Sequence, residues 1–71
     1  NDAALKSLGM TDREFAVLEL LAGGQSNKEI ARSLDISPNT VKSHVLKLFE
    51  KLEAQRRTQA VQKAKEFGLI P

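Results

Sequence analysis

The chain has 71 residues, a formal net charge of +2 and no cysteine, tryptophan or tyrosine. Because it also has a single histidine, it lacks the side chains for a disulfide framework or for a thiolate or imidazole metal site, and we expect no metal or other cofactor. The absence of tryptophan and tyrosine argues against the stacking platforms of single-stranded nucleic-acid binders. The length allows one small domain.

Residues 1–9 are interpreted as the end of a linker, because they are polar and have only Leu5 and Leu8 as apolar anchors. The chain begins at Asn1 and not at an initiator methionine, so we expect a domain of a longer protein, folded over residues 10–71. Nothing in the sequence approaches a transmembrane span or a secretion signal. We therefore expect a protein of the cytoplasm with no membrane partner.

The first predicted helix begins after Thr11, which is followed three residues later by Glu14 in the spacing of a capping box. Gly23 and Gly24 mark its end. The apolar residues between these signals are Phe15, Val17, Leu18, Leu20, Leu21 and Ala22. Such a helix is too apolar for the surface, so we expect it to be the central packing element.

Two further helix-start signals stand eleven residues apart, at Ser26 and Ser37. Ser26 precedes Glu29 in a second capping box, in which each side chain satisfies a free backbone N–H of the other residue. Ser37 precedes Pro38, whose fixed φ and missing N–H suit the first position of a helix. Each signal therefore predicts the start of a helix.

The first of these helices is expected over about residues 27–34 and the second over about 38–53. The short one has a single apolar stripe, formed by Ile30, Ala31 and Leu34. Only residues 34–36 remain for a tight turn. A short helix, a tight turn and a longer helix form a helix-turn-helix motif, here about residues 26–45, which places its second helix in the major groove of DNA.

The third helix has two different faces. At about 100° per residue, one narrow stripe is formed by Val41, Val45, Leu48 and Leu52, with Phe49 at its edge. This stripe must face the core. The opposite face presents Asn39, Lys42, Ser43, Leu46, Lys47 and Glu50.

On that outer face Lys42 can reach guanine O6 or N7, and Leu46 can contact a thymine methyl group. Single exposed leucines are also common on protein surfaces, so for Leu46 both interpretations stay open. Glu50 is interpreted as a surface residue that pairs with Lys47. His44 lies at the margin of the buried stripe and is interpreted as a packing residue, not a catalyst or ligand.

Donors for DNA phosphates cluster at the two helix starts, where the helix dipole favours anions. The first cluster is Ser26, Asn27 and Lys28, and the second is Ser37, Asn39 and Thr40. Capping alone explains Ser26 and Ser37 without a ligand. Lys28 and Lys42 have no capping role, so they are the stronger candidates for DNA contacts.

The fourth predicted helix covers roughly residues 57–67 and ends at Gly68. Its apolar stripe consists of Ala60, Val61, Ala64 and Phe67. No segment alternates with the period of a strand, so the expected fold is all-α, a compact four-helix bundle with no wing or sheet. Formal charge is −2 over residues 1–36 and +4 over 37–71. This asymmetry fits a polyanion partner or an ordinary solvated surface.

These residues resemble the LuxR/NarL-type helix-turn-helix domain of bacterial transcription regulators from Met10 to about Ile70. The positions that carry the resemblance are Thr11, Arg13, Glu14, Val17, Leu18, Gly24, Ser26 to Ala31, Leu34, Ile36, Ser37, Thr40 to Lys42, His44, Val45, Lys51, Leu52, Arg57 to Val61, Ala64, Gly68 and Leu69. So many matches in register are more specific than a general helix-turn-helix pattern.

The resemblance implies a domain that binds pseudo-palindromic promoter DNA as a homodimer through the fourth helix, where we place Val61 and Lys65. It is also compatible with RNA polymerase as a partner. It implies base contacts from Lys42, Ser43 and Leu46. Phosphate contacts are implied for Asn27, Lys28, Thr40 and Lys47.

The chain departs from the family pattern at positions that bear on these expectations. Met10 stands where leucine is usual, a mild change in the core. Glu53 stands where glycine is usual, so a different turn is expected between the third and fourth helices. Arg56 and Arg57 occupy the start of the fourth helix, which weakens its capping but adds cations for phosphate. Leu46 replaces a side chain that is polar in many members.

Two functions fit this sequence. The first is a sequence-specific DNA-binding domain, and the alternative is a four-helix protein-interaction module that does not bind DNA. An enzyme is not expected, because no nucleophile stands beside a plausible base and Gly23-Gly24 reads better as a helix end than as a phosphate loop.

Overall fold

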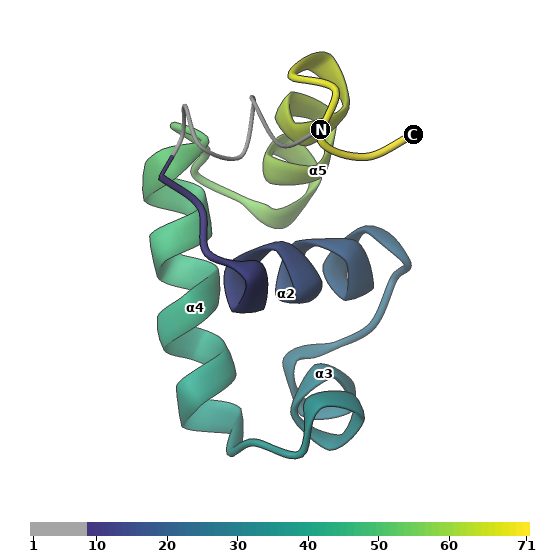
Figure 1. Cartoon of the computed structure of the whole chain (residues 1–71), viewed down its shortest axis with the longest axis vertical. Helices are drawn as coiled ribbons and strands as arrows, with labels where there is room; N and C mark the ends of the chain where they lie inside the picture. The colour runs from purple at the N-terminus through teal and green to yellow at the C-terminus, as the bar shows by residue number, and fades with distance from the viewer. Residues whose placement is uncertain (1–8) are drawn as a thin grey trace.

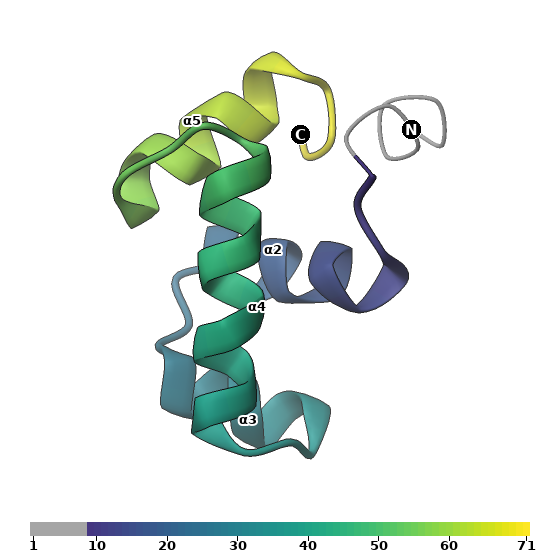
Figure 2. The same cartoon turned by 90° about the vertical axis from the view of Figure 1, so that its left-hand side faces the viewer.

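The computed structural model describes residues 9–71, which form four helices and no strand. They are α2 (Asp12–Ala22), α3 (Asn27–Leu34), α4 (Pro38–Lys51) and α5 (Arg57–Glu66). In Figures 1 and 2, α4 is the long upright helix, with α2 across its middle, α3 at its N-terminal end and α5 at its C-terminal end. The all-α class predicted from the sequence is confirmed. None of the described helices combines the length and apolar character that a membrane crossing requires.

Three of the four predicted helix starts carry the predicted caps. The Thr11 hydroxyl accepts from the Glu14 N–H at 3.1 Å, and the Glu14 carboxylate accepts from the Thr11 N–H at 3.0 Å. Ser26 and Glu29 form the same reciprocal pair at 3.2 and 2.9 Å. At α4, Ser37 accepts from the N–H of the third helical residue at 3.1 Å, with proline at the first helical position. Local sequence therefore fixes where α2, α3 and α4 begin.

Two non-glycine residues take left-handed backbone in the turns. Asp35 ends α3 with φ 57° and ψ 47°, and the Ile36 N–H then donates back to the Ala31 carbonyl at 3.0 Å. Glu53 has φ 53° directly after the C-cap of α4. Aspartate tolerates this conformation better than most residues, whereas glutamate gains nothing from it. The turn after α4 thus has the backbone of a glycine turn without a glycine.

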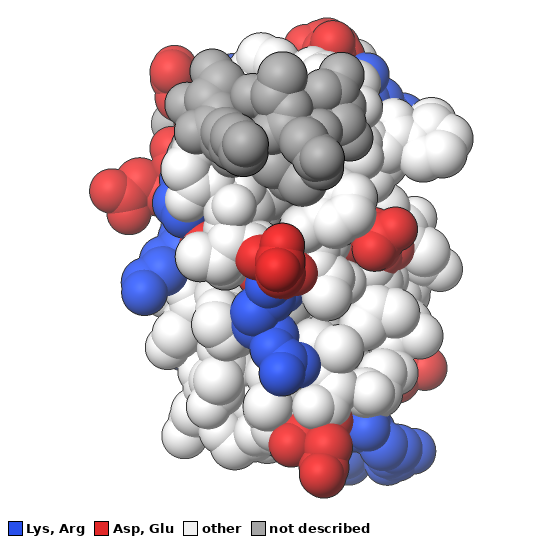
Figure 3. All heavy atoms as spheres, viewed as in Figure 1, with Lys and Arg blue, Asp and Glu red and all other residues white. Residues whose placement is uncertain are grey.

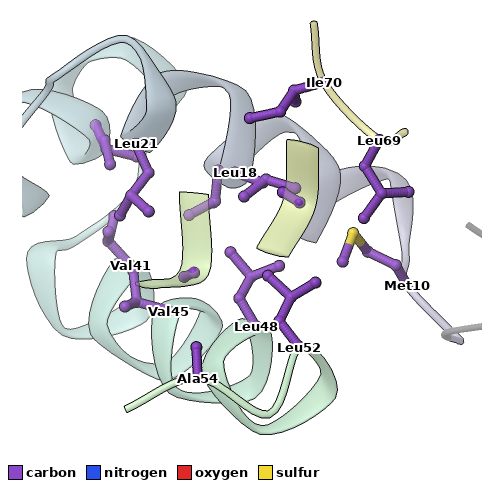
Figure 4. Packing of buried hydrophobic residues seen from close by; sticks show 14 of the residues in the cluster. Met10, Leu18, Leu21, Val41, Val45, Leu48, Leu52, Ala54, Leu69 and Ile70 are labelled. Carbon is purple, nitrogen blue, oxygen red and sulfur yellow. The ribbon is translucent and has the colours of Figure 1, made fainter. Parts of the chain in front are cut away.

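The core lies where the four described helices and the C-terminal residues meet. Its buried members are Met10, Val17, Leu18, Leu21, Ile30, Ala31, Val41, Val45, Leu48, Leu52, Ala54, Ala60, Ala64, Leu69 and Ile70. Figure 4 shows Leu48 and Leu52 pointing from α4 toward Leu18 of α2. The whole predicted inner stripe of α4 is buried, with Phe49 half-buried at its edge. The opposite side of α4 must therefore face outward.

The predicted end of the fourth helix is wrong in one respect. Phe67 does not belong to the buried stripe, because α5 ends at Glu66 and the Phe67 side chain is 47% exposed. Gly68 then reverses the chain with φ 74°, and Leu69 and Ile70 fill the core in its place. When the apolar periodicity of a helix is extended by one residue past its end, the C-cap residue, here Phe67, is wrongly assigned to the core. The linker assigned to residues 1–9, with Leu5 and Leu8, lies outside the described residues except for Gly9.

Candidate nucleic-acid interface

The outer face of α4 is exposed along its whole length. Every predicted member of this face is solvent-exposed: Asn39, Lys42, Ser43, Leu46, Lys47 and Glu50. Figure 2 looks onto α4, which stands in front of α2 while the C-terminus lies behind it. The C-terminal end therefore leaves this face open to a large partner.

Leu46 is the most unusual residue of this face. Its side chain is 58% exposed, and only one other large apolar side chain among residues 9–71, that of Phe67, is exposed. Ser43, one turn before it on the same face, donates its hydroxyl hydrogen to the Asn39 carbonyl at 3.2 Å. That hydroxyl keeps its lone pairs and can accept a hydrogen bond from a partner. The face thus offers a cation at Lys42, an acceptor at Ser43 and an apolar contact at Leu46.

Both helix starts use their serine as a cap, and they differ in charge. At α4, the Ser37 and Thr40 hydroxyl oxygens lie 2.8 Å apart and the first turn has no acidic residue. At α3, the Ser26 hydroxyl and Glu29 carboxylate are occupied by the capping box, and hydrogen bonding of the carboxylate to the backbone N–H and then to the side chain of Ser26 lowers the pKa of Glu29. Lys28 is exposed beside them. Lys28 is therefore the least committed polar group at the α3 start, and the α4 start is the more favourable of the two for an anion because it lacks a carboxylate.

Three of the seven cations of residues 37–71 are used within the domain, and four are exposed, two of them on α4 and the others, Arg56 and Lys65, at the two ends of α5. Lys51, Arg57 and Lys63 donate to acceptors within the domain. Lys42 and Lys47 are exposed on α4. On the face seen in Figure 3, charges of both signs are scattered over a mostly uncharged surface. Net charge therefore does not single out one face, whereas Lys42 and Lys47 share the outer face of α4.

An ion pair that the sequence pattern did not predict fixes the direction of α4. The Lys51 ammonium lies 2.7 and 2.9 Å from the two carboxylate oxygens of Glu14 and also donates to the Gly9 carbonyl at 2.6 Å. Burial raises the pKa of Glu14, but the hydrogen bonds from Lys51 and Thr11 and the charge of Lys51 outweigh it, so this pKa is lowered. The C-terminal end of α4 is thereby tied to the start of α2.

The remaining predicted positions are placed as follows. His44 is half-buried, as expected for a packing residue, and Glu50 is exposed. On α5, Val61 is half-buried and Lys65 is exposed. Within residues 9–71 no three histidine, aspartate or glutamate side chains come together as a metal site requires.

The start of α5 is capped weakly, as the two arginines predict. Arg56 is the N-cap residue and makes no side-chain capping hydrogen bond. The Gln59 side chain instead accepts from the Gln55 N–H at 2.7 Å. Arg57 is half-buried and contacts the start of α3, a contact that sequence patterns do not show because it joins residues 30 positions apart.

A capped short helix, a tight left-handed turn and a longer helix with an open polar face define a helix-turn-helix domain. Residues 8–64 match the family described as bacterial regulatory proteins, luxR family. The chain therefore belongs to the luxR family, as its sequence motifs predicted. This is a class of DNA-binding transcription regulators and not a class of enzymes.

Individual relatives agree with this assignment. The chain is 46% identical over 59 residues to the transcriptional regulatory protein DesR of Bacillus subtilis, covering 83% of this chain and 30% of DesR. It is 49% identical over 61 residues to the response regulator protein VraR of Staphylococcus aureus, covering 86% and 29% of the two chains. It is 56% identical over 52 residues to the CsgBAC operon transcriptional regulatory protein of Escherichia coli, covering 73% and 24%. The chain thus spans less than a third of the length of these relatives.

The fold also matches a solved structure. The transcription factor GerE superposes with a TM-score of 0.80 at 32% sequence identity, over 87% of this chain and 92% of that chain. The likeness covers nearly all of both chains, so the helix arrangement described above is that of this family.

Proposed function

We propose that this chain is the sequence-specific DNA-binding domain of a bacterial transcription regulator, with α4 inserted in the major groove. The observation that carries the proposal is the exposed outer face of α4. The opposite, apolar side of the same helix is buried against α2 and α3 and so holds the outer face toward solvent. The width of the major groove admits one α-helix. No chemistry is required, since binding and recognition are the whole activity.

Base recognition is assigned to Lys42, Ser43 and Leu46. The Lys42 ammonium donates to guanine O6 or N7, and the Leu46 side chain packs on a thymine methyl group. The Ser43 hydroxyl accepts from the amino group of cytosine or adenine, because its hydrogen already bonds to Asn39. These three contacts favour a half-site that contains both guanine and thymine.

Phosphate binding is assigned to the helix starts and to two exposed lysines. The positions are Ser26, Asn27, Lys28, Ser37, Asn39, Thr40 and Lys47. Phosphate contacts set the register of the protein on the duplex and supply sequence-independent affinity. Lys28 and Lys47 supply the positive charge for these contacts. Both are exposed, and neither takes part in the ion pair found among residues 9–71, which joins Lys51 to Glu14.

Specific binding is expected to require two copies. A single small domain buries too little surface to hold specific DNA tightly. A homodimer joined through α5, with Val61 and Lys65 at the contact, would place two α4 helices on a pseudo-palindromic promoter site. Such a regulator works in the bacterial cytoplasm, on the nucleoid when bound, and RNA polymerase is a natural further partner at a promoter.

The salt dependence of DNA affinity tests the proposal against the protein-interaction alternative, which the exposed Leu46 favours. Each phosphate contact contributes about −0.9 to the slope of log affinity against log salt. We expect a slope of several units, which Lys28→Ala makes shallower by about one while it weakens all duplexes alike. Lys65→Ala, on the last turn of α5, is the matched control and leaves the slope of a single domain unchanged. No measurable salt slope would support the protein-interaction module instead.

A further inference from the structure

Arg57 links the start of α5 to the start of α3. Its guanidinium donates from Nη1 to the Gln25 carbonyl at 2.8 Å and from Nη2 to Asn27 Oδ1 at 3.2 Å. Gln25 lies in the connection that follows α2, and Asn27 is the first residue of α3. A half-buried side chain of α5 thus holds the segment from which α3 begins.

This contact determines which end of the half-buried Asn27 amide is engaged within the domain. An asparagine side chain has one acceptor oxygen and one donor nitrogen, and it can turn either end toward a partner. A guanidinium has only donors, so the atom it touches must be the acceptor oxygen. The donor nitrogen of Asn27 is then the end left for another partner. Phosphate oxygens only accept, so only this orientation serves a phosphate contact.

We infer that Arg57 is a positioning residue for DNA binding, which holds the Asn27 amide with its donor end toward the phosphate backbone. The inference rests on the proposed function and adds to it a residue that touches no DNA. Arg57 is a poorer direct phosphate ligand than an exposed lysine, because its side chain is half-buried and two of its five N–H donors already donate within the domain. Its contribution passes through Asn27.

A double-mutant cycle on the 71-residue chain tests this coupling. Arg57→Lys keeps the positive charge but removes the planar fork that reaches two acceptors at once. We expect Arg57→Lys alone and Asn27→Ala alone each to weaken DNA affinity about fivefold, the size of one lost hydrogen bond. In the Asn27→Ala background, Arg57→Lys should change affinity less than about twofold. Two effects that multiply in the double variant would overturn the inference.

An arginine with no assigned DNA contact is the matched control. Arg13 is exposed on α2, so Arg13→Lys should leave DNA affinity unchanged. Thermal unfolding of each variant, measured beside its affinity, shows whether the domain stays folded at the binding temperature. If Arg13→Lys weakened binding as much as Arg57→Lys, a general effect of replacing arginine by lysine would take the place of the inference.

Asn27→Asp separates positioning from folding. Aspartate still accepts from Arg57, and as an acidic residue in the first turn of α3 it should maintain or increase thermal stability. It has no donor end, so DNA affinity should fall about tenfold or more while the domain stays folded. Wild-type affinity in Asn27→Asp would contradict the inference. If the unchanged chain showed no salt-dependent DNA binding at all, the proposed function itself would fail.

Discussion

Leu46 shows how a single side chain can be tested as a base reader. An exposed leucine has no polar group, so the base feature that it recognises best is the thymine methyl group. Replacing the contacted thymine by uracil removes this methyl and should weaken binding about threefold to fivefold, the value of one buried methyl group.

Leu46→Ala supplies the control for the thymine experiment. Alanine cannot reach the methyl group, so the variant should bind the thymine and uracil duplexes equally. Both duplexes and both proteins are compared by equilibrium titration at one salt concentration. A thymine preference that survives unchanged in Leu46→Ala would remove this residue from the recognition surface.

Glu53 carries a conformational cost that glycine would relieve. Its φ of 53° disfavours a residue with a Cβ atom by about 1 kcal/mol. Glu53→Gly should therefore raise the free energy of unfolding by up to about 1 kcal/mol, and the Lys63 ammonium keeps its acceptor because it bonds to the backbone carbonyl of residue 53. The measurement is urea unfolding. Glu50→Gly, within α4, is the opposite control and should lose about 1 kcal/mol.

At the scale of the elements, the Glu14–Lys51 pair makes the packing of α4 on α2 dependent on pH. The pKa of Glu14 is lowered in the folded state, so the carboxylate form is favoured by folding. The stability that it contributes is present above the ordinary carboxyl pKa and is lost as pH falls through the lower folded value. Acid should therefore loosen α4 from the start of α2.

Lys51→Met tests this pH dependence. At neutral pH it leaves a carboxylate that is 3% exposed without its cation and should cost about 3 kcal/mol of unfolding free energy. Near pH 3 the difference from the unchanged chain should shrink, because a protonated Glu14 needs no cation. Lys47→Met, on the exposed face, should change stability little at either pH. A loss of equal size at both pH values would show that packing of the Lys51 stem, not the charge pair, stabilises α4.

The starts of three helices were predictable because their signals are local, whereas α4 ends at Lys51, two residues before the predicted end. Capping residues three positions apart and a proline after a serine mark the starts of α2, α3 and α4 within the sequence itself. Gly68 marked the end of α5 in the sequence, but the exposure of Phe67 was not predictable, because the helical periodicity of the apolar residues continues through this C-cap position. Local sequence patterns therefore predict where a helix starts better than they predict where the core residues pass from α5 to the C-terminal residues that follow it.

The exposed surface of the candidate site was predictable from the sequence, but the long-range contacts that hold the helices in place were not. The outer face of α4 follows from the position of its valine and leucine stripe, which needs only 100° per residue. The contacts Lys51 to Glu14 and Arg57 to Asn27 join residues 37 and 30 positions apart, so no periodicity connects them. Neither contact was predicted, although the four residues that form them are among those that carry the family resemblance.

At the scale of the whole molecule, the small size of the domain predicts that two copies bind DNA together. Two domains joined by a flexible linker should bind a duplex with two half-sites about a hundredfold more tightly than one domain does. Moving one half-site by about five base pairs turns it to the other side of the duplex and should abolish most of this gain. Equal binding by the single and the joined domains would contradict dimeric recognition.

The most direct measurement of the central claim, that the outer face of α4 enters the major groove, is a methylation footprint of a bound site selected from random DNA. Dimethyl sulfate methylates guanine N7 in the major groove and adenine N3 in the minor groove. We predict protection of guanine N7 in each half-site, lost in Lys42→Ala together with about 1–3 kcal/mol of discrimination against the other bases. Protection confined to adenine N3, or guanine protection unchanged by Lys42→Ala, would contradict the placement of α4.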